Sequence, residues 1–228
     1  MNLLFILLTT LIPSDQPNKA QSYFGDAYND AYAFFLQEKD ILKEESRATD
    51  CNWKTVAAVT FPEFIRYDQV RNLLEEEALY LGYVNGGAGL VDFSIGRMQM
   101  KPSFAEQVEE HLLEHPEVFL KSNIPSYDPE GGPVRRQRLE RLQSFAWQVR
   151  YACAFVHLMT HRFPFLEEQP YKEQVAFLSA AYNLGPKADE ATIRKWMQTE
   201  AFPYGSRFKG EQLCYAEVAS EFHETINR

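Results

Sequence analysis

The sequence predicts a mainly α-helical fold with at most a small β-hairpin. Between Arg135 and His161 the apolar residues recur at three- and four-residue steps, which is the period of one buried helical face. Another apolar segment, Tyr171 to Asn183, stops at Gly185 and Pro186, residue types that commonly end helices. The run 90–94 has the composition of a short strand. Because 45% of the 228 residues are apolar, the chain is long enough to form one well-buried domain.

The first 20 residues have the features of an export signal. Residues 1–12 form an apolar run that matches the core of a signal peptide and is too short to span a bilayer as a helix. Residues 18–20, Asn-Lys-Ala, offer a cleavage site with a small residue, although no Lys or Arg precedes the apolar run. We expect residues 1–20 to be removed and the protein to be periplasmic or secreted, in the bacterial cell envelope.

The rest of the chain is expected to comprise an N-terminal extension and a main domain. Residues 21–50 should form a helical extension, because aromatic clusters alternate with Glu and Lys from Tyr23 to Arg47. We expect this extension to pack over the main domain, residues 51–228, where it could hold a partner protein or cover a cleft. Helices in the main domain are expected at 53–60, 68–83, 103–116, 135–161, 171–183, 192–197 and 211–226, with 135–161 at the centre. Ser103 and Glu106 have the spacing of a capping box.

The composition excludes some functional classes. A formal net charge of -9 would repel nucleic acid and is compatible with a neutral glycan. The glycine-rich residues 85–89 lack the Gly-Lys-Ser/Thr ending of a phosphate-binding loop and are therefore expected to form a turn. The clearest loop is 127–133. Three cysteines, Cys51, Cys153 and Cys214, permit at most one intramolecular disulfide, and none has the histidine of a recognisable thiol-nucleophile signature nearby.

Glu63 is the strongest candidate for a catalytic residue. Val56, Val59 and Glu63 share one helical face, so a carboxylate stands where the apolar stripe should continue. Burial there would raise its pKa toward a value useful for donating a proton near neutral pH, as a general acid does. Pro62 lacks a backbone N–H, so we expect the helix to end or kink here and the acid to face a cleft. The alternative is that Glu63 begins a new turn and faces water.

Two further motifs follow Glu63. They are residues 94–102, Ser-Ile-Gly-Arg-Met-Gln-Met-Lys-Pro, and residues 180–185, Ala-Ala-Tyr-Asn-Leu-Gly. In this order the three motifs resemble those of the lysozyme-like lytic transglycosylases, in the superfamily of the soluble lytic transglycosylases and goose-type lysozymes. The resemblance implies a lysozyme-like helical fold with Glu63 as the catalytic acid. It also implies five substrate-binding residues in a cleft: Ser94, Met98, Gln99, Tyr182 and Asn183. Tyr215 is similar to the tyrosine with which the family begins its last helix.

The resemblance further implies a function. The enzyme would cleave the MurNAc-GlcNAc bond of peptidoglycan glycan strands with one Glu as acid and then base, without a metal or any other cofactor. Two related alternatives remain open. A hydrolytic muramidase would need a second carboxylate, for which Asp92 is the candidate. A non-catalytic peptidoglycan-binding module would keep the cleft without the activity.

A metallopeptidase is the main alternative from another class. His111 and His115 fit an H-x-x-E-H pattern, and His157 and His161 form a second pair four residues apart. Either pair could bind zinc from one helical face. However, Pro116 interrupts the helix directly after the first pair, and no Glu lies within the second. We therefore assign no metal ligands from the sequence. A helical domain whose motifs match by chance is the remaining alternative.

Overall fold

The computed structural model describes residues 17–70, 76–125, 128 and 131–228 of the chain. Within these residues it confirms a mainly α-helical fold with one small antiparallel hairpin. In chain order the elements are α1 (Lys19–Phe24), α2 (Asp26–Ala48), α3 (Trp53–Val70), α4 (Glu76–Gly86), α5 (Pro102–Glu114), α6 (Pro116–Ser122), α7 (Gly132–Gln143), α8 (Phe145–Arg162), the 3-10 helix η1 (Pro164–Glu168), α9 (Tyr171–Leu184), α10 (Glu190–Trp196), β1 (Glu200–Phe202), β2 (Leu213–Cys214) and α11 (Tyr215–Asn227).

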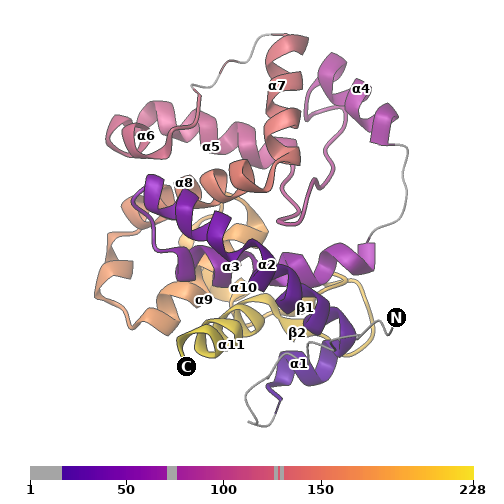
Figure 1. Cartoon of the computed structure of the whole chain (residues 1–228), viewed down its shortest axis with the longest axis vertical. Helices are drawn as coiled ribbons and strands as arrows, with labels where there is room; N and C mark the ends of the chain where they lie inside the picture. Colours follow the sequence, from indigo (N-terminus) through magenta and orange to yellow (C-terminus); the bar gives the residue numbers. More distant parts are fainter. Residues whose placement is uncertain (1–16, 71–75, 126–127, 129–130) are drawn as a thin grey trace, which may run out of the picture.

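Helix α8 runs through the middle of the molecule. On one side it packs against α5, α6 and α7, with α4 beside α7, and on the other against α2, α3 and α9 (Figure 1). The single helix predicted for 135–161 is in fact α7 followed by α8, with Ser144 between them in an extended conformation. The side chain of Gln148, in the first turn of α8, donates to the Leu142 carbonyl at 2.7 Å. This bond satisfies a carbonyl at the end of α7 that an unbroken helix would satisfy internally.

Helix α3 carries Glu63 in a buried stretch. Residues 55–65 are all buried, and α3 packs against α2, α8, α9 and α11. The helix was expected to end or kink at Pro62; it does not end there, because α3 continues to Val70 with Pro62 inside it. Next to the proline, the Phe61 ring stacks on Phe222 of α11 with centroids 3.6 Å apart and meets Tyr28 of α2 edge-on. Packing from both sides offsets the hydrogen bond that the proline cannot make.

The N-terminal helices are part of the same core rather than a layer over it. Phe34 of α2 packs edge-on against Phe64 of α3, and Phe35 packs edge-on against Phe222 of α11. The exposed side of α2 carries Leu36 and Ile41, which are 41% and 39% exposed. Binding of a partner protein through residues 23–50 stays a prediction. Such a partner could contact only this exposed side of α2.

Helix α1 begins inside the segment expected to be removed as a signal. The Asn18 side chain caps α1 by accepting from the Gln21 N–H at 2.7 Å. Ala20 is fully buried, and its N–H donates to Glu221 of α11 at 2.9 Å. Cleavage after Ala20 would remove these contacts, and the export signal at residues 1–20 stays a prediction. Residues 1–16, which hold the apolar run, lie outside the described residues, and no helix in the described part is long and apolar enough to cross a membrane.

Predicted structure around the motifs differs from the observed structure in two places. Residues 91–94 form no strand; instead Ile95 and Met100 pair in an isolated antiparallel bridge, and the two-stranded sheet is formed by β1 and β2. The helix predicted at 68–83 corresponds to the end of α3 and most of α4, and 71–75 lie outside the described residues. The loop predicted at 127–133 is described only at 128 and 131–133, where α7 begins at Gly132.

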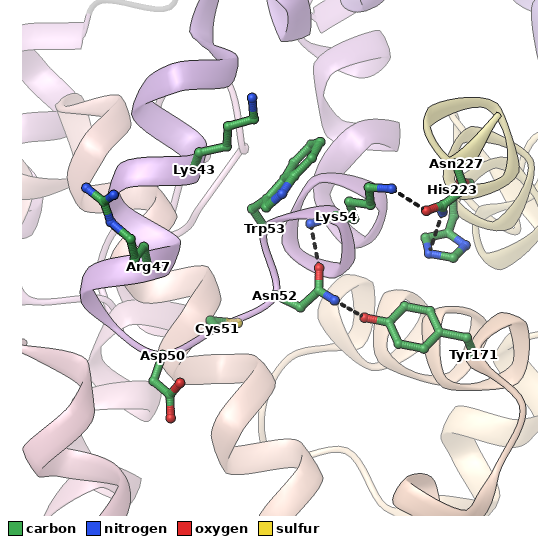
Figure 2. A pocket seen from close by; sticks show the side chains of 10 residues that line it. All are labelled: Lys43, Arg47, Asp50, Cys51, Asn52, Trp53, Lys54, Tyr171, His223 and Asn227. Atoms are coloured by element: carbon green, nitrogen blue, oxygen red, sulfur yellow. Dashed lines mark hydrogen bonds between the residues drawn. The ribbon is translucent and has the colours of Figure 1, made fainter.

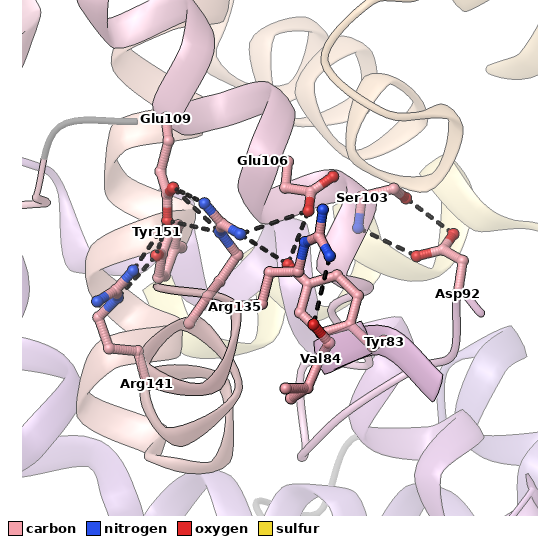
Figure 3. A network of polar contacts seen from close by, with 10 residues as sticks. Tyr83, Val84, Asp92, Ser103, Glu106, Glu109, Arg135, Arg141 and Tyr151 are labelled. Carbon is pink, nitrogen blue, oxygen red and sulfur yellow. Dashed lines mark hydrogen bonds and ion pairs between the residues drawn. The ribbon is translucent and has the colours of Figure 1, made fainter. Parts of the chain in front are cut away.

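A network of buried charges holds α5, α7 and α8 together (Figure 3). Glu109 of α5 accepts from the Arg138 Nη2 at 2.6 Å and from the Arg141 Nη2 at 3.1 Å, both on α7. It also accepts from the Tyr151 hydroxyl of α8. Since the Glu109 and Arg138 side chains are each only 1% exposed, every lone pair and N–H in this network needs its partner. The Arg138 Nη1 donates at 2.7 Å to Tyr83, which ties α4 to the network.

Candidate functional site

Glu63 is a buried carboxylate with polar neighbours from three helices. It is 3% exposed, and the Arg66 Nη1, one turn later on α3, donates to its two oxygens at 3.1 and 3.2 Å. The Asn183 Nδ2 at the end of α9 donates to Oε1 at 3.4 Å. The Tyr215 hydroxyl, at the start of α11, donates to the Val59 carbonyl at 3.3 Å and also interacts with the Glu63 carboxylate. One hydroxyl proton can serve only one of these acceptors at a time.

Burial decides the protonation preference of Glu63. Removal from water raises the pKa of the carboxyl above its ordinary value, while the Arg66 charge and the hydrogen bonds from Tyr215, Asn183 and Arg66 act in the opposite direction. Burial, followed by the nearby Glu63 charge, raises the pKa of both Tyr182 and Tyr215, so these hydroxyls stay protonated donors. The site therefore favours a proton on Glu63 at a higher pH than an exposed glutamate would hold it.

The two neighbouring residues Tyr182 and Asn183 have different partners. The Asn183 Oδ1 accepts from the Trp196 Nε1 of α10 at 2.9 Å, which leaves its amide N–H groups directed toward Glu63. The Tyr182 hydroxyl donates to the Met98 carbonyl at 3.0 Å, and its ring packs edge-on against Phe104. Asn183 therefore contacts the acid, whereas Tyr182 anchors the segment that forms the opposite wall.

That segment, residues 95–100, is a tight loop closed by two hydrogen bonds between Ile95 and Met100, of 2.9 and 3.1 Å. The Gln148 Nε2 donates to the Ile95 carbonyl at 2.7 Å, and its Oε1 accepts from the Met98 N–H at 3.1 Å. Gly96 has φ +64°, and a Cβ placed on it would lie 2.0 Å from the Gln148 Nε2. Both its conformation and the close approach of Gln148 thus require glycine here.

Met98 and Gln99, both expected to bind substrate, are placed differently. The Met98 side chain is fully buried in the core and does not line the cavity, so a contact between Met98 and substrate stays a prediction; its backbone carbonyl accepts from Tyr182. Gln99 faces the cavity, with its backbone in the left-handed region at φ 47°. Its Nε2 donates to the Gly96 carbonyl at 2.9 Å, so it also stabilises the turn.

Asp92, the candidate second carboxylate, caps helix α5. Its Oδ1 accepts from the Ser103 N–H at 3.0 Å and its Oδ2 from the Ser103 hydroxyl at 2.8 Å (Figure 3). The Lys101 Nζ lies 3.7 Å from Oδ2. The capping box predicted for Ser103 and Glu106 is therefore wrong: α5 begins at Pro102, and Glu106 accepts from Tyr83 at 2.7 Å. Both Asp92 oxygens already have partners at the start of α5.

A cavity of about 230 Å³ brings most of the predicted site together. Its lining includes six of the seven predicted residues: Glu63, Asp92, Ser94, Gln99, Tyr182 and Asn183. The sequence analysis missed three residues that position them. Arg66 is three residues beyond Glu63, and an unbroken helix through Pro62 would have placed it beside the acid. Gln148 is far from the motifs in the sequence, Trp196 comes 13 residues after Asn183, and neither carries a motif of its own.

A larger cavity of about 890 Å³ lies where α2, α3, α9 and α11 meet. Figure 2 shows Lys43 and Arg47 of α2 on one side, Tyr171 on the other, and Trp53 between them. The Lys43 ammonium lies 5.5 Å from the centroid of the Trp53 ring. Asp50, the carboxylate in this lining, is exposed. For acid catalysis, which needs a carboxyl group with a raised pKa, the smaller cavity at Glu63 is the candidate.

Comparisons with protein-family models, with curated proteins and with solved structures found no match for this chain. Function is therefore inferred from the residues and geometry of the Glu63 cavity.

Proposed function

We propose that the chain is a periplasmic or secreted peptidoglycan lytic transglycosylase with a lysozyme-like fold, which cleaves the MurNAc-GlcNAc bond with Glu63 as acid and then base. The observation that carries the proposal is the position of Glu63, 3% exposed and with a raised pKa, in a cavity lined by residues from both later motifs. A neutral carboxyl group beside polar side chains is the requirement for protonating a glycosidic oxygen.

The reaction needs one carboxyl group in two roles. Protonated Glu63 gives its proton to the glycosidic oxygen as the bond between that oxygen and the anomeric carbon breaks. The Glu63 carboxylate then takes the proton of the MurNAc 6-hydroxyl while that oxygen bonds to the anomeric carbon. Glu63 is protonated again, no water is consumed, and the product carries a 1,6-anhydro ring.

Arg66 and Asn183 suit the half of the cycle in which Glu63 is ionised. The guanidinium at 3.1 Å and the amide at 3.4 Å would stabilise the carboxylate after it has given up its proton. Burial opposes that charge, so neither protonation state is strongly excluded, as a group that both donates and accepts a proton requires.

The position of Asp92 favours this route over a hydrolytic one. A muramidase that inverts the anomeric centre needs a second carboxylate to activate water. Both oxygens of Asp92 accept hydrogen bonds from Ser103 at the start of α5, so activation of water would compete with the helix cap.

The test is digestion of purified peptidoglycan followed by mass spectrometry of the soluble products. The proposal expects muropeptides lighter by one water than the hydrolysis products, and no release by Glu63→Gln. Glu168→Gln, which changes an exposed carboxylate, is the matched control and should release products normally. Reducing-end products would refute the transglycosylase step and indicate a muramidase. No release by folded, unmodified protein would refute catalysis and leave binding to sacculi as the remaining hypothesis.

A further inference from the structure

The two histidine pairs of the sequence contribute one member each to a three-residue cluster. His115 lies between α5 and α6, Glu117 is the second residue of α6, and His161 is in the last turn of α8. The donor atoms of the three side chains all lie within 4.8 Å of one another, at the surface where α6 packs against α8. His111 and His157, the other members of the two pairs, are not part of the cluster. The cluster joins two parts of the chain separated by more than 40 residues.

We propose that His115, Glu117 and His161 form a binding site for a zinc-class divalent transition metal ion. Two imidazoles and one carboxylate, with a fourth position open to solvent, make up a common three-ligand zinc set. Imidazole ligands favour zinc, copper, nickel and cobalt over magnesium and calcium, which prefer oxygen ligands.

The distances support coordination. Zn–N and Zn–O bonds of about 2.0–2.1 Å in a tetrahedron place neighbouring ligand atoms about 3.3–3.4 Å apart. The Glu117 Oε1 lies 3.5 Å from the His115 Nδ1 and 3.2 Å from the His161 Nε2. The same carboxylate oxygen thus forms two edges of nearly the required length, whereas charge-assisted hydrogen bonds are typically shorter, about 2.7–2.9 Å.

The site is accessible and distinct from the Glu63 cavity. The His115, Glu117 and His161 side chains are 35%, 57% and 48% exposed, so an ion can enter without opening the core. None of the three lines the cavity at Glu63. The bound ion would connect the corner between α5 and α6 to the end of α8, and would therefore stabilise the folded chain in proportion to ion concentration.

The test measures metal binding directly, with full-length protein purified without a histidine tag and stripped of metal. Titration with Co²⁺ should give the visible absorption of a tetrahedral N/O site at one ion per chain, and Zn²⁺ should displace it. His115→Ala and His161→Ala should each weaken Zn²⁺ binding at least tenfold, as measured by calorimetry, and Glu117→Gln should weaken it less. The midpoint of thermal unfolding should rise with Zn²⁺ in the unmodified protein and not in the two alanine variants.

His111 and His157 supply the matched controls. Each is the partner, four residues away, of one proposed ligand, and each lies outside the three-residue cluster. His111→Ala and His157→Ala should bind Zn²⁺ as the unmodified protein does. Three results would overturn the proposal: no saturable Zn²⁺ binding by folded protein, loss of binding in His111→Ala or His157→Ala equal to that in the cluster variants, or a thiolate-to-cobalt absorption band, which would assign the ion to cysteine.

Discussion

Replacing Glu63 with Gln should stabilise the protein relative to the unmodified protein by an amount that increases as pH rises from acidic to neutral and alkaline values. Burial raises the pKa of Glu63 in the folded chain, so the folded state prefers the neutral form. The stabilising contribution of that neutral form is fully present below the unfolded pKa, about 4.3, and is lost as pH rises through the folded pKa. Glutamine is neutral throughout and has nearly the same shape, so the variant does not lose this contribution.

The size of the effect follows from the linkage between protonation and folding. We define the difference as the free energy of unfolding of Glu63→Gln minus that of the unmodified protein. Between the two pKa values this difference should increase by about 1.4 kcal/mol per pH unit, and above the folded pKa it should become constant. For a domain of this length each kcal/mol corresponds to a shift of about 2–4 °C in the midpoint temperature. The changed contact with Arg66 adds an offset that does not depend on pH over this range, so the informative quantity is the slope.

Urea unfolding of both proteins from pH 4 to pH 8 measures this difference. Glu168→Gln should show no slope, since its side chain is exposed. Two results would refute a raised pKa of Glu63. The difference in free energy of unfolding could be independent of pH, or the unmodified protein could become more stable relative to Glu63→Gln as pH rises. The second result would mean that the Arg66 ion pair outweighs burial, and Glu63 would then be ionised at neutral pH and unable to donate a proton.

Two other predictions concern the supports of the site. Glu109→Gln should lower the free energy of unfolding by about 3–5 kcal/mol in urea, because it leaves buried arginine charge without its carboxylate. Its control is Glu110→Gln, which removes a half-exposed ion pair with Lys187 and should change the free energy of unfolding little. Equal effects of the two substitutions would show that the network does not act as a unit. Gly96→Ala should both destabilise the protein and abolish release of muropeptides, because its Cβ would overlap Gln148. Gly205→Ala is its control: φ is +87° there with open space around the Cβ, so it should cost only about 1–2 kcal/mol of backbone strain and retain activity.

The sequence alone could predict the parts of the site that depend on local spacing. The helical face shared by Val56, Val59 and Glu63 depends on residues a few positions apart, and all three are buried in α3. The continuation of α3 through Pro62 could not be predicted in this way. It depends on Phe222, about 160 positions later, and on Tyr28, whose rings hold the helix from both sides.

The wall opposite Glu63 shows the same limit. The motif at 94–102 predicted a segment beside the candidate acid, and residues 94, 99, 100 and 101 line the cavity with Glu63, but a pattern of residue types does not say which side chains face the cavity. Met98 is directed into the core because its backbone is held by Gln148 and Tyr182, which lie about 50 and 84 positions away. Asp92, the candidate second carboxylate, lines the cavity, but its hydrogen bonds to Ser103 at the start of α5 depend on a helix start that the sequence analysis had placed one residue later.

The coverage of α3 has a consequence for how the chain is synthesised. The burial that raises the pKa of Glu63 is supplied by α2 from the N-terminal part of the chain and by α9 and α11 from the C-terminal part. While α11 is still in the ribosome, Phe61 has no ring to stack on and Tyr215 cannot reach the carboxylate. A nascent chain therefore has an ordinary, hydrated Glu63, and the group acquires its acid character only in the completed protein.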